Sequence, residues 1–160
     1  GNLPIGQGEL VTPMQMMTAY AAIANGGILR RPRVVQSLDG RPVPISRGKR
    51  ILSPGTAHEV RKMLEGVLAP GGTASEVKIP GYALAGKTGT ANKIDPATGN
   101  YSEEKYVASF VGMAPADKPR LLVSVIVDEP QGAIYGGEVA APAFGKIASF
   151  ALPYLRIPPS

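Results

Sequence analysis

The segment from Gly86 to Ala91 joins one cationic side chain, two hydroxyls and two glycines at the end of a β-prone run. The ammonium of Lys87 would hold a proton relay or an anionic group by charge, and the hydroxyls of Thr88 and Thr90 would bind a carboxylate. Gly89 would let a substrate backbone approach the strand edge closely. The segment therefore predicts an anion-binding strand.

The composition excludes several other chemistries. The chain of 160 residues has no cysteine and one histidine, His58, so it cannot build a thiolate zinc site, a histidine cluster or a Ser-His-Asp triad. We therefore predict no metal and no cofactor. A P-loop is excluded because no Gly-x-x-x-x-Gly-Lys spacing leads to Lys87. Gly6-Gln7-Gly8 is interpreted as a structural turn, because the predicted helix begins several residues after it.

The net charge of +5 is densest between residues 30 and 62. No aromatic residues interleave with these cations and no nucleic-acid motif is present, so we expect no nucleic-acid partner. No apolar run approaches the ~20 residues that span a bilayer, since the longest, residues 121–127, contains Ser124. The chain shows no signal peptide, and its abrupt opening at Gly1 leads us to expect a piece of a longer protein.

Three helices are predicted from capping residues and apolar periodicity. They run from the cap at Thr12 to a stop at residues 25–27, from Ser53 to a stop at residues 70–72, and from Glu138 to Leu152. The second helix is expected to bury the stripe Val60, Met63, Leu64, Val67 and Leu68. Met16 and Met17 are interpreted as core-filling in preference to an adaptable binding surface, and His58 as solvated.

Three strands are predicted over residues 82–91, 105–113 and 120–127, with residues 92–104 as a polar loop. The third strand is nearly all apolar, as expected of a strand covered on both faces, so helices must pack on both sides of it. A basic, weakly paired hairpin is predicted around an Asp39-Gly40 turn. Together these elements predict one α+β layered unit over residues 1–160.

Several segments follow the order found in class B penicillin-binding proteins and cover nearly the whole chain. They are Gly6-Gln7-Gly8, Thr12-Pro13-Met14-Gln15, Ala24-Asn25-Gly26-Gly27, Gly86 to Ala91, Phe110 to Pro115, and Tyr135-Gly136-Gly137 before Ala140-Ala141-Pro142. Lys-Thr-Gly is one of three motifs of serine β-lactamases and penicillin-binding proteins. The sequence resembles the C-terminal part of a class B transpeptidase domain, most of all the septal one. This implies an antiparallel sheet covered by helices on both faces.

In that family a serine attacks a D-Ala-D-Ala peptide stem, and the acyl group passes to an amine of a second stem, which cross-links peptidoglycan. β-Lactams imitate the first stem. The resemblance implies that Lys87 is catalytic by ordering the proton network of the serine, and that the backbone N–H of Thr90 is an oxyanion-hole donor. It implies that Thr88, Gly89 and Thr90 bind substrate. Tyr135 would form an aromatic wall, although a structural aromatic is about equally expected.

The nucleophile motif of the family is missing. Ser-x-Asn does not occur, and Ser-x-x-Lys occurs only at Ser46/Lys49, Ser75/Lys78 and Ser102/Lys105, none of which opens an apolar helix. We interpret these as solvated loop residues and expect the chain alone to be inactive. Two alternatives stay open: a non-catalytic scaffold or sensor module, and a D,D-carboxypeptidase or β-lactamase relative.

The resemblance also implies partners and a location. The partners would be peptidoglycan peptide stems, β-lactam antibiotics, the remaining part of the same transpeptidase domain, and other cell-division proteins. The protein would lie at the bacterial cytoplasmic membrane, with its catalytic domain on the outer face.

Overall fold

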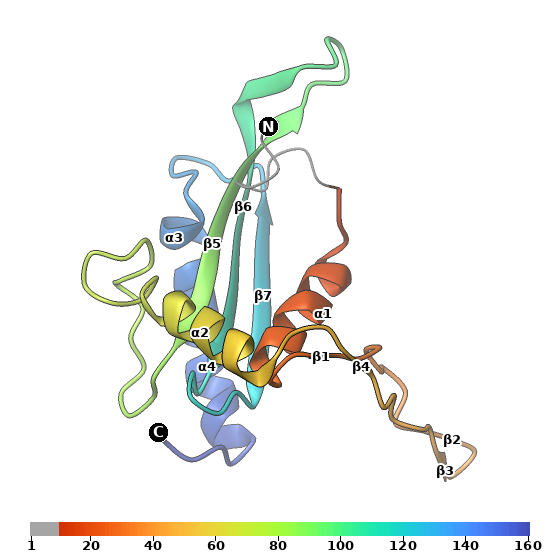
Figure 1. Cartoon of the computed structure of the whole chain (residues 1–160). Coiled ribbons are helices and arrows are strands. Elements are labelled where there is room, and N and C mark those ends of the chain that lie inside the picture. The colour runs from red at the N-terminus through yellow and green to blue at the C-terminus, as the bar shows by residue number, and fades with distance from the viewer. Residues whose placement is uncertain (1–9) are drawn as a thin grey trace.

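A three-stranded antiparallel sheet forms the centre of the structure (Figure 1). The computed structural model describes residues 10–160, so Gly6-Gln7-Gly8 lies outside the described residues. The strands are β5 (Ala85–Ile94), β6 (Tyr101–Ala114) and β7 (Leu121–Asp128), in the order β5-β6-β7. The helices are α1 (Pro13–Ala24), α2 (Pro54–Glu65), α3 (Gly136–Val139) and α4 (Ala141–Tyr154). The predicted α+β architecture is confirmed.

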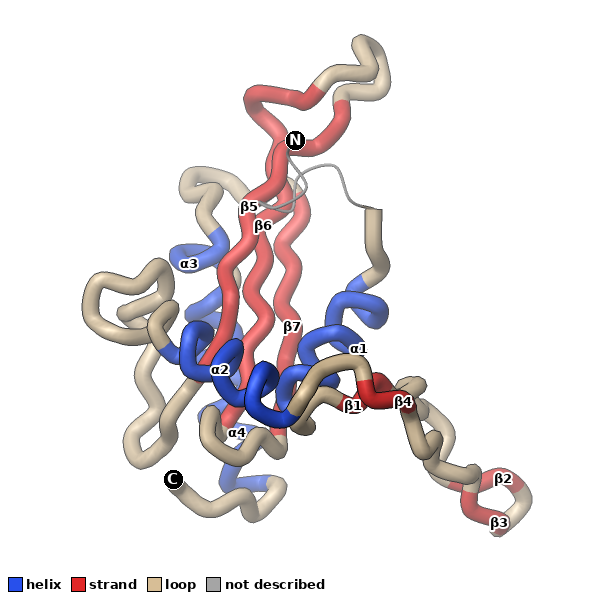
Figure 2. The backbone as a smooth tube through the Cα atoms, in the orientation of Figure 1, coloured by secondary structure: helices blue, strands red, loops and turns tan. Residues whose placement is uncertain are grey.

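The alternation of side chains along the strands gives the sheet two different faces. On one face, Met113 of β6 packs with Tyr20 and Ile23 of α1 and with Leu64 of α2. On the other face, Phe110 of β6 packs against Phe144 of α4, with ring centroids 5.1 Å apart. Helices therefore cover both faces, as predicted, and the tube in Figure 2 shows the strands between them.

The predicted starts of the first two helices are confirmed. Thr12 and Gln15 form a reciprocal capping box at α1, with N–H to side-chain oxygen distances of 2.8 and 3.2 Å. The Ser53 hydroxyl accepts a hydrogen bond from the Thr56 N–H at 3.0 Å and caps α2.

Two helix boundaries were wrong. The second helix ends at Glu65, before the predicted stop, because the N–H groups from Gly66 to Leu68 bond to carbonyls three residues back and a series of turns follows. The third predicted helix is two helices that meet at Ala140, and Pro142 lies in the first turn of α4, where its missing N–H costs no hydrogen bond.

The strands also differ from the prediction. Strands β5 and β6 continue as a paired hairpin through most of the predicted loop 92–104 and leave only residues 95–100 as the turn. This extension has polar residues on both sides, so it lacks the apolar alternation by which strands are recognised. Both α1 and α4 pack against β7, but β7 is an edge strand among residues 10–160 and is only half-buried. The Lys93 ammonium of β5 donates hydrogen bonds to the carboxylates of Glu129 and Asp128, at 2.7 and 2.9 Å, and these bonds raise the pKa of Lys93.

The core-filling interpretation of the methionines was wrong for Met16, which is exposed, whereas Met17 is half-buried. Met63 of the predicted buried stripe is exposed as well, while Leu64 and Leu68 are buried. His58 is exposed, as predicted. Within residues 10–160, no helix is long and apolar enough to cross a membrane, and no group of His, Cys, Asp and Glu is arranged to hold a metal ion.

Residues 28–52 form an extended arm, which we call the basic arm. At its base β1 (Ile28–Leu29) pairs with β4 (Lys49–Arg50), and at its tip β2 (Ser37–Leu38) pairs with β3 (Arg41–Pro42). The predicted weak hairpin around Asp39-Gly40 is confirmed, and the pairing of β1 with β4 was not predicted. Figure 1 shows the arm pointing away from the sheet.

Candidate functional site

The Lys-Thr-Gly segment lies in β5, and β5 is an edge strand among the residues that the structure describes. One side of β5 pairs with β6, with Lys87 opposite Val111, Thr88 opposite Phe110 and Gly89 opposite Ser109. Its other side has no strand partner in the described part of the chain. The backbone of this segment can therefore receive an extended ligand.

The four residues of Lys87-Thr88-Gly89-Thr90 divide between the two faces of the sheet. A Cβ on Gly89 would collide with the Ser109 hydroxyl, and Lys87 lines a cleft together with Met16 and Tyr20 of α1. Thr88 and Thr90, in contrast, reach the residues around α3. The ammonium and the two hydroxyls thus approach the free edge of β5 from opposite faces.

The cleft beside Lys87 has a volume of about 320 Å³ and lies between β5, β6 and α1. The Lys87 ammonium donates one hydrogen bond, 2.8 Å long, to the carbonyl of Thr88 and forms no ion pair with a described residue. An ammonium has three N–H donors, so two are available to a ligand. Burial raises the pKa of the Tyr20 phenol.

The hydroxyls of Thr88 and Thr90 each have a hydrogen-bonding partner within the protein. The Thr88 and Thr73 hydroxyls lie 2.9 Å apart and share one hydrogen bond. The Gly136 N–H donates to the Thr90 hydroxyl at 3.2 Å, so the Thr90 proton is available to another acceptor. When Thr73 donates to Thr88, the Thr88 proton is available as well. The arrangement suits an anion at the edge of β5.

Two adjacent glycines let α3 approach this strand. A Cβ on Gly136 would collide with the carbonyl oxygen of Ser109, and a Cβ on Gly137 would collide with that of Thr73. Tyr135, directly before them, is exposed and does not cap α3 with its side chain. The Tyr135-Gly136-Gly137 segment therefore lies beside β5, although the two are more than forty residues apart in sequence.

Several site residues were not predicted. Ser109 is recognised only from its register opposite Gly89, and Met16 and Tyr20 only from the packing of α1. The sequence gives some indication of Thr73, because the Gly71-Gly72-Thr73 turn follows a predicted helix and precedes the predicted strand. Lys87, Thr88, Gly89 and Thr90 lie in β5, and Tyr135 directly precedes Gly136, whose N–H donates to Thr90. The chemical roles of these residues stay predictions.

The three Ser-x-x-Lys sequences lie outside this site and at no helix start. Ser46 is in the basic arm, where its hydroxyl accepts from the Gly48 N–H at 3.2 Å. Ser75 is in the turns after α2. Ser102 is in β6 and accepts from the N–H groups of Glu104 and Lys105 at 3.2 and 3.0 Å. The assignment to loops is confirmed for Ser46 and Ser75 and was wrong for Ser102, which lies in a strand.

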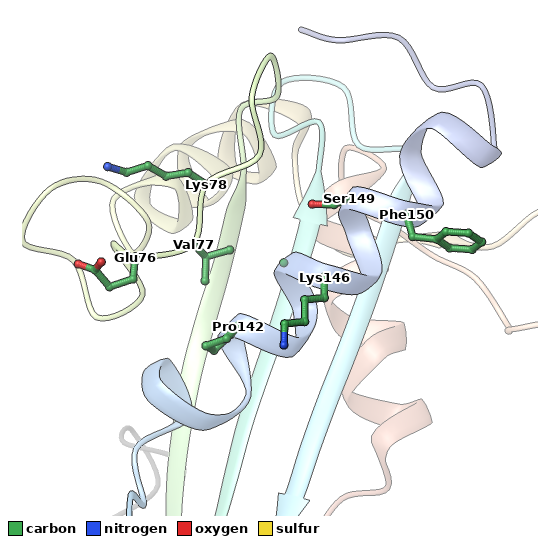
Figure 3. Close-up of a pocket in the computed structure, with 8 residues that line it drawn as sticks. Glu76, Val77, Lys78, Pro142, Lys146, Ser149 and Phe150 are labelled. Carbon is green, nitrogen blue, oxygen red and sulfur yellow. The ribbon is translucent and has the colours of Figure 1, made fainter.

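A larger hollow, of about 650 Å³, lies elsewhere, between α4 and the loop before β5 (Figure 3). Its polar side chains do not converge: Lys78 extends away from α4, whereas Lys146 comes from the middle of α4. A ligand site needs polar groups that point to one place. The smaller cleft beside Lys87 meets this condition better.

An edge strand with Lys-Thr-Gly-Thr, in an antiparallel sheet covered by helices, is typical of the penicillin-recognising acyltransferases and serine β-lactamases. The family model "Penicillin binding protein transpeptidase domain" matches residues 1–149. The chain belongs to this family and corresponds to part of a class B transpeptidase domain. Its homologues include the septal proteins.

Individual relatives agree with this assignment. The chain is 41% identical to the peptidoglycan D,D-transpeptidase FtsI of Escherichia coli over 96% of its length and 25% of that protein, and 41% identical to PbpB of Mycolicibacterium smegmatis over 98% of its length and 26% of that protein. The apo structure of penicillin-binding protein 3 from Mycobacterium tuberculosis superposes with a TM-score of 0.87 at 38% identity, covering 99% of this chain and 39% of that one. The same relative has been solved with aztreonam and with ampicillin. The chain thus spans about a quarter of the curated relatives.

Proposed function

We propose that this chain is the Lys-Thr-Gly part of a peptidoglycan D,D-transpeptidase, which cross-links peptide stems through a serine acyl-enzyme and is acylated by β-lactams. The serine and its Ser-x-x-Lys and Ser-x-Asn motifs lie in a part of the same domain outside these 160 residues. Residues 1–160 and that part fold as one unit. The protein acts at the outer face of the cytoplasmic membrane, alongside other cell-division proteins.

The observation that carries this proposal is the convergence of one ammonium and two hydroxyls on the free edge of β5. Lys87 faces the cleft with two available N–H donors and orders the proton network of the incoming serine. Thr88 and Thr90 donate to the carboxylate of the stem. The Thr90 N–H donates to the oxyanion that forms when the serine attacks, Gly89 admits the stem backbone, and Tyr135 forms one wall.

Labelling with a fluorescent penicillin tests this proposal. The full-length protein is expected to form a covalent adduct, because the completed domain holds the serine. The 160-residue chain is expected to form none. A labelled band from the chain that disappears with Ser46→Ala, Ser75→Ala or Ser102→Ala would contradict the proposal, as would a full-length protein that is never labelled. Reaction of the full-length protein with a pentapeptide stem and an acceptor amine then separates transfer from hydrolysis.

Removing the hydroxyl of Thr73 is expected to slow acylation of the full-length protein. Thr73→Val takes away the hydrogen-bonding partner of Thr88, a loss of about 1 kcal/mol, or roughly fivefold in rate. The measurement is the second-order rate constant for acylation by a fluorescent penicillin. Thr73→Ser is the matched control, because it keeps the hydroxyl and should retain the wild-type rate. Equal rates for the Val and Ser variants would show that the Thr73 hydroxyl does not position Thr88.

A further inference from the structure

The basic arm holds all of the net positive charge of the chain. Residues 28–52 contain seven of the 17 Lys and Arg residues and, in Asp39, one of the 12 Asp and Glu residues. The other residues therefore carry ten cations and 11 anions. Charge segregated on one projecting segment points to an anionic partner rather than to general solubility.

Three of the seven arm cations stabilise the arm itself. Arg33 donates to the carbonyl of Val43 at 2.7 Å, and Arg30 to that of Ser46 at 3.4 Å. Arg50 donates to the carbonyls of Gly26 and Leu52 at 2.7 and 3.0 Å, which fixes the base of the arm to the end of α1. These guanidinium groups connect the two sides of the arm where only short strand pairs exist. These hydrogen bonds therefore give the basic arm a defined structure.

The side chains of the other four cations make no contact that stabilises the described part of the chain. They are Arg31, Arg41, Arg47 and Lys49, all exposed and without a side-chain hydrogen bond or ion pair to a described residue. Apolar side chains lie between them, with Val34 90%, Leu38 67% and Ile45 66% exposed. Cations alone attract any anion, whereas cations mixed with exposed aliphatic groups match a protein surface of the opposite charge.

We propose that the basic arm is a docking site for an acidic segment of a partner protein, in which carboxylates alternate with apolar residues. A lipid surface fits less well, because the tip of the arm carries Asp39 and no residue of the arm is aromatic. Nucleic acid fits less well because no ring is available for base stacking. Pro32, Pro42 and Pro44 lack the N–H groups that strand addition needs, so the side chains make the contact.

Binding of a fluorescein-labelled peptide of repeating Glu-Val units to the full-length protein tests this proposal. The arm variant changes Arg31, Arg41, Arg47 and Lys49 to Glu. The control variant changes Lys78, Lys118, Arg120 and Lys146 to Glu, which alters the net charge equally but on the body of the protein. We expect the arm variant to weaken binding at least about tenfold and the control variant to bind nearly as the wild type does. High salt should weaken wild-type binding.

Three outcomes would overturn the proposal. Equal losses in the two variants would mean that only net charge matters. Equal binding of a Glu-Ser peptide would mean that Val34, Leu38 and Ile45 take no part. Arm-dependent binding to vesicles of phosphatidylglycerol and phosphatidylcholine, without peptide binding, would assign the arm to the membrane. Acylation by a fluorescent penicillin should be unchanged in the arm variant, so this test is independent of the proposed transpeptidase function.

Discussion

Replacing Lys87 by alanine in the full-length protein is expected to slow acylation by a fluorescent penicillin by about 10²- to 10⁴-fold, the range that a positioned proton-transfer group contributes. The ammonium faces the cleft beside β5 and has two N–H donors that no described residue uses. The serine must lose a proton as it attacks, and a neighbouring cation stabilises the charged state that follows. Stability should change little, because Lys87 is exposed.

The matched control is Lys105→Ala. Lys105 lies on β6 of the same sheet, is exposed, and has no side-chain hydrogen bond or ion pair within the described residues. The Lys105→Ala variant should be acylated at the wild-type rate, and both variants should keep the melting temperature of the wild type. If Lys87→Ala acylates and cross-links as the wild type does, the scaffold or sensor alternative replaces the transpeptidase proposal.

The sequence allowed the residue types along β5 to be recognised, but not the segments that contact them. Lys87, Thr88 and Thr90 were recognised from residue type and order, because their sequence motif together with the surrounding segments forms a rare combination. That Lys87 and the threonines lie on opposite faces follows from the period of two along a strand. Thr73 and Gly136 were not predicted as their partners, because hydrogen bonds between segments distant in sequence leave no local pattern.

The basic arm and the end of the β5–β6 hairpin show why other parts escaped prediction. The pairing of Ile28 with Arg50 joins residues more than twenty positions apart, and neither strand has a buried face. The outer half of the hairpin, around residues 92–104, is exposed or only half-buried and has no buried face either. Apolar periodicity reports burial, so elements without a buried face are missed. Met16 was assigned to the core for the converse reason: an apolar residue at helical spacing can also line a cleft.

Replacing Phe144 by alanine is expected to destabilise the protein by about 3–5 kcal/mol, the usual cost of removing a buried phenylalanine. Phe144 is 0% exposed, and its ring packs against Phe110. Its edge also occupies the space that a Cβ on Gly112 would need, so Gly112 has no side chain to fill the cavity. The Phe110 ring in turn lies against Gly86, the residue before Lys87. Loss of this packing should therefore loosen the strand that carries the site.

Phe150→Ala on the same helix separates burial from the mere loss of an aromatic ring. Phe150 is 70% exposed and stacks on Tyr154 at the surface, with ring centroids 5.6 Å apart. We expect its replacement to cost less than about 1 kcal/mol. Urea denaturation of the full-length protein, with the slope and midpoint fitted for each variant, measures the difference. Equal midpoints for Phe144→Ala and Phe150→Ala would show that α4 is not held to the sheet through Phe144, and the support of β5 would then have to come from α2.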